Sequence, residues 1–254
     1  MTDLSGKKGL VVGVANDQSI AAGCANVFAA KGADLALTYL NEKARPFVQP
    51  VADGVDASIF EPLDVMDNAA LPRLFDKITE TWGRLDFLLH SIAYCPKEDL
   101  HGRLTDCSRD GFVQAMDVSA HSFIRMARLA EPLMADGGSL MTVSYYGAEK
   151  VVGHYNVMGP VKAALEGVVR YLAAELGAQG IRVNTLSPGP LNTRAASGID
   201  HFDEIIEEAR TRAPAQRMVT IEEVGAMAAF LASDDAKAIT GDTAYIDGGY
   251  HVMS

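Results

Sequence analysis

Short apolar runs alternate with amphipathic stretches along most of this chain. The runs are rich in β-branched and aliphatic residues, which is typical of strands buried on both faces of a sheet. Predicted strands are Gly9–Val14, Asp34–Tyr39, Ala57–Pro62, Leu85–Ala93, Ser139–Ser144, Ile181–Leu186 and Thr243–Asp247. Predicted helices are Ser19–Lys31, Asn68–Trp82, Arg109–Leu133, Tyr155–Leu176 and Ile221–Leu231.

This β-α-β order predicts an α/β fold, a Rossmann-type doubly wound parallel sheet of about seven strands with helices on both faces. Its ligand should lie beyond the carboxyl ends of the strands. No linker, repeat or low-complexity tract interrupts the chain, so we expect a single dinucleotide-binding catalytic domain over residues 1–254. Residues 188–217 break the alternation with small residues and prolines, which favours a substrate-binding loop.

Composition narrows the possible partners. The formal net charge is −11, from 33 acidic and 22 basic residues, and it opposes nucleic acid and anionic membranes. No apolar run approaches the roughly 18 residues of a membrane span, and the N-terminus leads almost directly into a strand without a signal peptide. Three cysteines without CxxC spacing fit a reduced, cytoplasmic protein, and we expect no metal site.

The turn after the first strand has the features of a cofactor site. Gly13 permits a tight turn, and Ser19 is placed to cap the next helix. Free N–H groups at a helix N-terminus suit a pyrophosphate. Gly23 would let this helix pack closely on the sheet. The turn lacks the GxGxxG pattern, so by itself it is weak evidence.

Other strand ends add to the cofactor site. Asp64, after the third strand, can accept the adenine amino group while the Val65 N–H approaches the ring, although Asp64 could instead cap the following helix. His90 is predicted to be a hydrogen-bonded core histidine. Leu40, at the end of the second strand, carries neither the acid that favours NAD nor the arginine that favours NADP, and Lys43 and Arg45 lie further into the loop. This favours NADH, with NADPH as the alternative.

Tyr155 and Lys162 are the best candidates for chemistry. On a regular helix the two side chains leave the same face, where tyrosine can donate a proton and lysine can hold a polar ligand. Pro160 lies between them and cannot donate a helical hydrogen bond, so the helix could instead begin late or kink there.

Five motifs together resemble the bacterial enoyl-acyl-carrier-protein reductases, which are divergent short-chain dehydrogenase/reductases of type II fatty acid synthesis. The motifs are G-x5-S-I-A-x-G from Gly13, HSIA from His90, SYYGAEK from Ser144, YNVMG-x-x-K from Tyr155 and GP-x-x-T-x-AASGI from Gly189. The resemblance runs from about Leu4 to Gly249.

The resemblance implies a role for each matching position. Tyr155 matches the catalytic tyrosine, Lys162 the lysine that holds the nicotinamide ribose, and Tyr145 the second active-site tyrosine. Cofactor-contacting positions are Gly13, Ser19, Ile20, Leu40, Asp64, Val65, Ile92, Lys162, Leu191, Asn192, Thr193, Arg194 and Ala195, with Leu40 standing where glutamine is common. Substrate-contacting positions are Cys95, Met158, Ile199 and Phe202.

The spacing of the pair also speaks to the reaction. Carbonyl-reducing members carry Tyr-x3-Lys, but here that position is Met158, and Tyr155 lies three residues earlier, about 4.5 Å along a helix. A displaced acid fits hydride delivery from NADH to C3 of a trans-2-enoyl thioester, with Tyr155 stabilising the enolate oxygen. Side-chain orientation could produce the same offset.

The alternatives are another short-chain reductase, such as a 3-oxoacyl-carrier-protein reductase, and a non-catalytic NAD-sensing protein. A nucleophilic Cys95 is a further idea, although the sequence shows no basic partner for it. The resemblance implies a homotetramer and an acyl carrier protein as partner. The docking surface is open, because acidic residues follow the loop where the family often has basic ones. Candidate replacements are Arg194, Arg210, Arg212 and Arg217.

Overall fold

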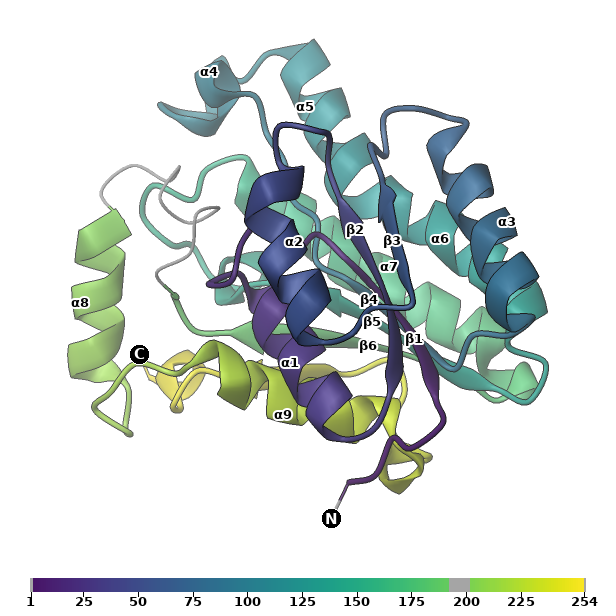
Figure 1. The fold of residues 1–254 in the computed structure, drawn as a ribbon. Coiled ribbons are helices and arrows are strands. Elements are labelled where there is room, and N and C mark those ends of the chain that lie inside the picture. The colour runs from purple at the N-terminus through teal and green to yellow at the C-terminus, as the bar shows by residue number, and fades with distance from the viewer. Residues whose placement is uncertain (1, 192–201, 254) are drawn as a thin grey trace.

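Seven parallel strands form one sheet in the order β3-β2-β1-β4-β5-β6-β7 (Figure 1). The computed structural model describes residues 2–191 and 202–253. The strands are β1 Lys8–Val12, β2 Asp34–Tyr39, β3 Ile59–Pro62, β4 Phe87–His90, β5 Gly138–Val143, β6 Ile181–Pro188 and β7 Thr243–Ile246. The strand order reverses between β1 and β4, which is where a doubly wound sheet opens a crevice for its ligand. The predicted fold class is confirmed.

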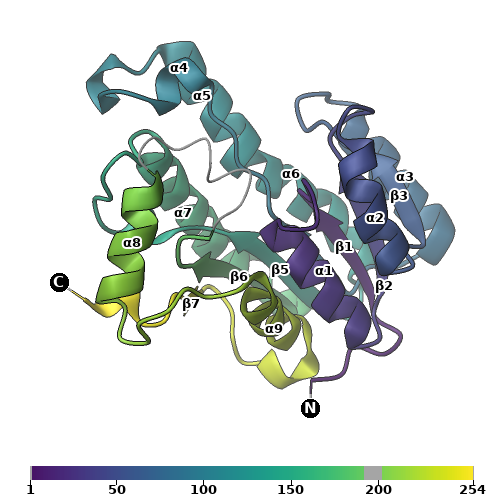
Figure 2. The same cartoon turned by 60° about the vertical axis from the view of Figure 1, so that its left-hand side comes forward.

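Helices cover both faces of the sheet (Figures 1 and 2). The α-helices are α1 Ile20–Ala30, α2 Arg45–Gly54, α3 Ala70–Trp82, α4 Lys97–Leu100, α5 Arg109–Met116, α6 Ser122–Ala130, α7 Met158–Leu176, α8 Phe202–Arg212 and α9 Ile221–Ala232. Helices α1, α2 and α9 cover one face, and α3, α6 and α7 cover the other. Figure 2 shows α8 at one flank of the sheet, with α4 and α5 projecting above it.

Two apolar cores lie on opposite faces of the sheet because side chains alternate along each strand. Leu10 and Val12 of β1 pack towards α3, α6 and α7. Val11 of the same strand packs with Leu35 and Leu37 of β2 towards α1, α2 and α9. All five are buried. This arrangement explains why the strands read as continuous apolar runs.

The predicted strands are all present, with ends that differ by a few residues. The predicted helix Arg109–Leu133 contains a π-helical turn, Asp117–His121, between α5 and α6. Ser119 in that turn accepts a hydrogen bond from the Tyr94 N–H at 3.0 Å. Ser119 of the π-helical turn therefore joins this long helical segment to the chain that follows β4.

Helices α2 and α8, and the four-residue helix α4, are absent from the sequence prediction. Pro46 and Pro50 lie in α2 and argue against a helix, but Pro46 falls in the first turn, where its missing N–H has no helical partner to lose. Helix α8 occupies part of the 188–217 segment and is rich in charged residues. Pro50 inside α2 and the charged composition of α8 explain why the sequence pattern did not reveal these two helices.

The helix that carries Lys162 begins at Met158, so the predicted start at Tyr155 is wrong. Pro160 sits in the first turn of α7, where no helical hydrogen bond is required of it. The backbone on both sides of Tyr155 is left-handed, with φ of 62° at His154 and 41° at Asn156. Tyr155 therefore lies in a strained turn before the helix, and its offset from Lys162 is no displacement along a helix axis.

Helix α1 packs against α9, and Gly23 makes this contact possible. A Cβ atom added at Gly23 would lie 2.6 Å from Cβ of Ile221, the first residue of α9. The expectation that Gly23 serves packing on the sheet is therefore wrong. The close approach is between two helices on the same face.

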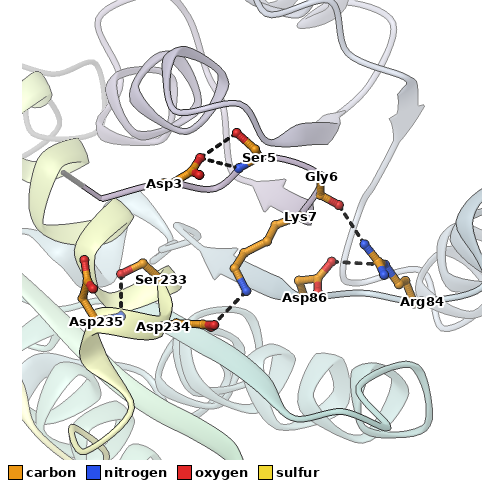
Figure 3. Close-up of a pocket in the computed structure, with 9 residues that line it drawn as sticks. All are labelled: Asp3, Ser5, Gly6, Lys7, Arg84, Asp86, Ser233, Asp234 and Asp235. Carbon is orange, nitrogen blue, oxygen red and sulfur yellow. Dashed lines mark hydrogen bonds and ion pairs between the residues drawn. The ribbon is translucent and has the colours of Figure 1, made fainter.

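A cavity of about 530 Å³ lies at the amino edge of the sheet (Figure 3). It is bordered by the segment before β1, the segment before β4 and the end of α9. The ion pairs Lys7–Asp234 (3.2 Å) and Arg84–Asp86 (3.4 Å) join charges on its wall. The Lys7–Asp234 pair ties the N-terminal segment to the chain that follows α9, at the opposite edge of the sheet from the predicted site. Among the described residues, no helix is long and apolar enough to cross a membrane.

Candidate active site

Tyr145 and Tyr155 meet beyond the carboxyl end of β5. Their ring centroids are 4.9 Å apart with an interplanar angle of 72°, an edge-to-face contact. Tyr155 is buried. The Tyr145 hydroxyl is also buried and has no hydrogen-bond partner among the described residues. A buried hydroxyl of this kind is available to a ligand, since buried polar groups are otherwise nearly always paired.

Lys162 comes to this strand end from α7. Its side chain is buried, and Nζ donates a hydrogen bond to the Val143 carbonyl oxygen at 2.6 Å. Val143 is the last residue of β5, two residues before Tyr145. Burial lowers the pKa of Lys162 to about 8, and nearby Glu166 acts against that shift. The lysine can therefore change its charge near physiological pH.

Both tyrosines are held in their protonated form. Burial raises the pKa of Tyr155, and the neighbouring Tyr145 and Glu166 raise it further. Burial is also the main cause that raises the pKa of Tyr145. Each hydroxyl therefore enters the site as a hydrogen-bond donor and not as a phenolate base.

The turn between β1 and α1 passes close to the backbone that follows β4. Gly13 has φ of 95°, and a Cβ there would lie 2.0 Å from the Ser91 carbonyl oxygen. Ser19 caps α1 by accepting a hydrogen bond from the Ala22 N–H at 3.2 Å. No acidic residue lies in the first turn, which Ile20 begins. This helix end suits an anion, as a pyrophosphate site requires.

The other predicted cofactor positions line the ends of neighbouring strands. Leu40 follows β2 and is 54% exposed. Asp64 follows β3, and its carboxylate accepts a hydrogen bond from the Met66 N–H at 2.9 Å, so it does not cap α3, which begins at Ala70. Val65 is buried beside it. Ile92 follows β4 and is partly buried against the core beneath α3, α6 and α7.

A small apolar cluster adjoins the tyrosines and is separate from the two main cores. Tyr155, Met158 and Val161 are buried in it, and Cys95 and Tyr145 pack against it. It brings together two of the predicted substrate positions, Cys95 and Met158. Burial raises the pKa of the Cys95 thiol to about 11, which leaves little thiolate at neutral pH and argues against a nucleophilic role.

The remaining predicted positions lie at or beyond the end of β6. Leu191 is buried against the core beneath α1 and α9. Phe202 is the first residue of α8. The other predicted positions fall outside the described residues; they are Asn192, Thr193, Arg194, Ala195 and Ile199.

His90 is a hydrogen-bonded core histidine, as predicted. It is fully buried at the end of β4, with Nδ1 2.9 Å from Thr142 Oγ1 and Nε2 2.8 Å from Ser122 Oγ. Burial lowers its pKa to about 3, with a further contribution from the charge of Lys162. The ring is therefore neutral at physiological pH and serves to join β4, β5 and α6.

Comparison with known proteins shows to which family this chain belongs. A family model described as Enoyl-(Acyl carrier protein) reductase matches residues 13–251. The chain is 47% identical over 250 residues, covering 98% of this chain and 92% of its relative, to an enoyl-[acyl-carrier-protein] reductase [NADH] of Rhizobium meliloti. The chain belongs to the enoyl-acyl-carrier-protein reductase family.

Solved structures of enoyl-acyl-carrier-protein reductases have the same fold as this chain. A crystal structure of the enoyl-(acyl-carrier-protein) reductase of Anaplasma phagocytophilum in complex with NAD has a TM-score of 0.95 at 47% identity, covering 99% of this chain and 96% of that one. The Bacillus cereus reductase, with NADP+ and an indole naphthyridinone, has a TM-score of 0.97 at 42% identity and full coverage of both chains.

The reductase site contains buried polar residues that sequence reasoning missed. Glu166 is 6% exposed, and its carboxylate accepts a hydrogen bond from Ser144 Oγ at 2.6 Å. Thr185 and Ser187 of β6 carry buried hydroxyls without a partner among the described residues. An acid one helical turn after Lys162, which places both side chains on one face of the helix, was the available signal. No cluster of three or more potential metal ligands occurs in the described ranges.

Proposed function

We propose that this chain reduces the trans-2 double bond of an enoyl thioester with NADH, the last step of the type II fatty acid elongation cycle. The observation that carries this is the tyrosine pair, with Tyr155 edge-to-face against Tyr145 and the buried Tyr145 hydroxyl left unpaired. The membership of the chain in the reductase family supports the same reaction.

The mechanism follows from the protonation state of these groups. NADH, when bound, supplies the hydride that reaches C3 of the substrate. Tyr155 donates a hydrogen bond to the thioester oxygen as negative charge develops there, and such a pre-positioned donor stabilises the transition state. Lys162 holds the ribose and adds positive charge beneath the site. Tyr145 meets the substrate with its free hydroxyl, and Cys95 and Met158 border the acyl chain.

The position of Tyr155 is set by the strained turn that precedes α7, and not by a displacement along the helix axis. Left-handed residues on both sides direct the ring towards Tyr145 and the small apolar cluster. Tyr155 thus lies just before the first turn of α7 and packs beside Met158 and Val161 of the helix that carries Lys162. In this proposal the tyrosine serves the thioester oxygen and the lysine serves the ribose, as conjugate reduction requires.

Gly13, Ser19 and Ile20 are proposed to hold the pyrophosphate, since they belong to the turn that leads into the N-terminus of α1, whose first turn carries no acidic residue. Asp64 and Val65 take the adenine, and Leu40, Ile92 and Leu191 line the remaining length, with Asn192–Ala195 beyond. NADH is favoured over NADPH because Arg45 stacks over Tyr39, 5.6 Å from the ring centroid, and pairs with Glu42 at 3.6 Å. Its charge is thus partly engaged near the end of β2.

An acyl carrier protein is the proposed carrier of the thioester. Three of the arginines considered for docking are engaged within the chain: Arg210 pairs with Glu207 at 2.6 Å, Arg212 with Glu208, and Arg217 with Glu223 at 2.6 Å. Arg194 lies outside the described residues. Measuring kcat/KM for carrier-protein and coenzyme A thioesters of one enoyl chain tests the carrier. A clear preference for the coenzyme A thioester would contradict this proposal.

We further propose a single catalytic domain over residues 1–254, in which residues 188–217, including Ile199 and Phe202, bind substrate. We also propose a homotetramer in the cytoplasm. The three cysteines are free thiols, which fits a reducing compartment. The exposed apolar side chains on α5, α6 and α7 offer surfaces for assembly.

The decisive assay follows NADH and NADPH oxidation with a crotonyl or longer trans-2-enoyl thioester and with the matching 3-oxoacyl thioester. We expect turnover of the enoyl substrate with NADH and little turnover of the 3-oxoacyl substrate. The reverse preference would indicate a 3-oxoacyl reductase. No turnover of either, with NADH still bound, would indicate a non-catalytic NAD-binding protein.

A further inference from the structure

Two side chains of α7 form hydrogen bonds with consecutive residues at the end of β5, and we call these two contacts the clamp. Lys162 Nζ donates a hydrogen bond to the Val143 carbonyl oxygen, and Glu166 accepts one from Ser144 Oγ, each at 2.6 Å. Residues four apart lie on the same helix face, one turn from each other. Tyr145 directly follows Val143 and Ser144 in the chain. The position of its ring against Tyr155 therefore depends on this clamp.

Glu166 is almost completely buried, which gives its charge a strong influence on nearby groups. Its hydrogen bond from Ser144 stabilises the ionised carboxylate, as do the charges of Lys162 and Arg170 on the same helix. Glu149, from the segment after β5, opposes ionisation, and burial raises the pKa of Glu166 most.

Other titratable groups face the pair from the surrounding elements. His90 of β4 feels the charge of Lys162, but its ring is neutral at physiological pH. Tyr245 of β7 and Tyr155 before α7 feel the charge of Glu166, and burial holds both in the neutral form. Among these groups Glu166 is the one whose charge favours the cationic form of Lys162.

We propose that Glu166 is a positioning residue for catalysis, keeping the Lys162 ammonium charged and holding Ser144 so that Tyr145 stands against Tyr155. The inference rests on the proposed role of Lys162 in holding the ribose. A buried hydrocarbon side chain would fill the same space, so packing alone does not explain a carboxylate at this position. Glu166 would then act on the charge of Lys162 and, through Ser144, on the position of Tyr145.

The test is the pH dependence of NADH binding and of kcat/KM in Glu166→Gln, which keeps the size and a hydrogen-bond acceptor but removes the charge. NADH binding is measured by fluorescence titration and needs no turnover. Lys162 must be protonated to bind the ribose well, so binding should weaken as pH rises past about 8 in the wild type. In Glu166→Gln this basic limb should move about one pH unit lower.

Glu175→Gln is the matched control, because it removes the same charge from an exposed position on the same helix. Its limb should coincide with that of the wild type. Ser144→Ala removes the hydrogen-bond donor and leaves Glu166 in place. It should move the limb in the same direction by a smaller amount and lower kcat by at least about threefold through Tyr145.

Different results of these measurements would contradict the role of Glu166 and the role of Lys162. A basic limb in the wild type that stays in place in both Glu166→Gln and Ser144→Ala overturns the role of Glu166. A wild type without any basic limb in NADH binding overturns the role of Lys162 and thus that part of the proposed function. Circular dichroism melting identifies a variant that fails to fold, and Ser144→Ala then carries the test.

Discussion

Burial determines the chemistry of three titratable residues near the carboxyl ends of β4 and β5. Removal from water disfavours the charged form of each side chain. It keeps Tyr155 a donor, brings the pKa of Lys162 to about 8, and lowers the pKa of His90 to about 3. The same cause therefore yields a donor, a titratable cation and a neutral structural ring at adjacent positions.

Replacing Tyr155 with Phe should lower kcat for an enoyl thioester by about 10²-fold or more, because one pre-positioned donor to the developing oxyanion is lost. The ring and its contact with Tyr145 remain, so NADH affinity should change little. Steady-state kinetics and fluorescence titration with NADH measure the two quantities. Full activity in this variant would remove Tyr155 from the mechanism.

His90 should make the protein less stable in mild acid. Its folded-state pKa of about 3 lies below the unfolded value of about 6.5, so its contribution to stability is present above pH 6.5 and is lost as pH falls towards 3. The loss between pH 7 and pH 5 should be about 2 kcal/mol. Denaturant unfolding at both pH values measures it.

His90→Asn isolates this effect because asparagine does not titrate in that range. The variant should be less stable at pH 7, since it packs less well, but its stability should fall less between pH 7 and pH 5. An unchanged pH dependence in His90→Asn would show that other groups cause the acid sensitivity.

At the scale of elements, α7 shows how a tertiary site departs from a sequence pattern. The residues from Tyr155 onward have helical composition, yet the helix begins at Met158 because Pro160 is acceptable only in its first turn. The left-handed turn at His154 and Asn156 is stabilised by long-range contacts, including Asn156 Nδ2 to the Leu100 carbonyl oxygen at 3.1 Å. Local propensity carries no information about such a contact.

Gly23→Ala should destabilise the protein by about 1–3 kcal/mol, because the new methyl group would collide with Ile221 and push α1 away from α9. Gly54→Ala is the matched control, since a Cβ at Gly54, in α2, meets nothing within 4 Å. It should be neutral or slightly stabilising, as alanine favours helix. Equal effects of the two substitutions in thermal unfolding would disprove the close helix contact.

At the scale of the whole molecule, the chain presents apolar side chains that a monomer leaves in water. Tyr171 on α7 is 82% exposed, and Phe112, Val113 and Ile124 on the α5–α6 segment are also exposed. Scattered exposed apolar residues are normal, but their presence on neighbouring long helices fits burial in an assembly. Together with the family, this motivates the proposed homotetramer.

Sedimentation of the wild type should give a species of four 27.1 kDa chains. Tyr171→Glu places a charge in the proposed interface on α7 and should shift the distribution towards smaller species, because burying an unpaired charge is costly. A monomeric wild type, or a Tyr171→Glu variant that sediments as the wild type does, would contradict an interface at Tyr171.

The sequence by itself determined the parallel sheet and the family, and it predicted a cofactor turn at Gly13 and Ser19, because apolar periodicity and short motifs are local properties of the chain. It also indicated a core role for His90. Only the tertiary structure decided where α7 begins, that Gly23 faces α9, and that Glu166 and Lys162 hold the end of β5. These features depend on contacts between distant segments, which no local pattern encodes.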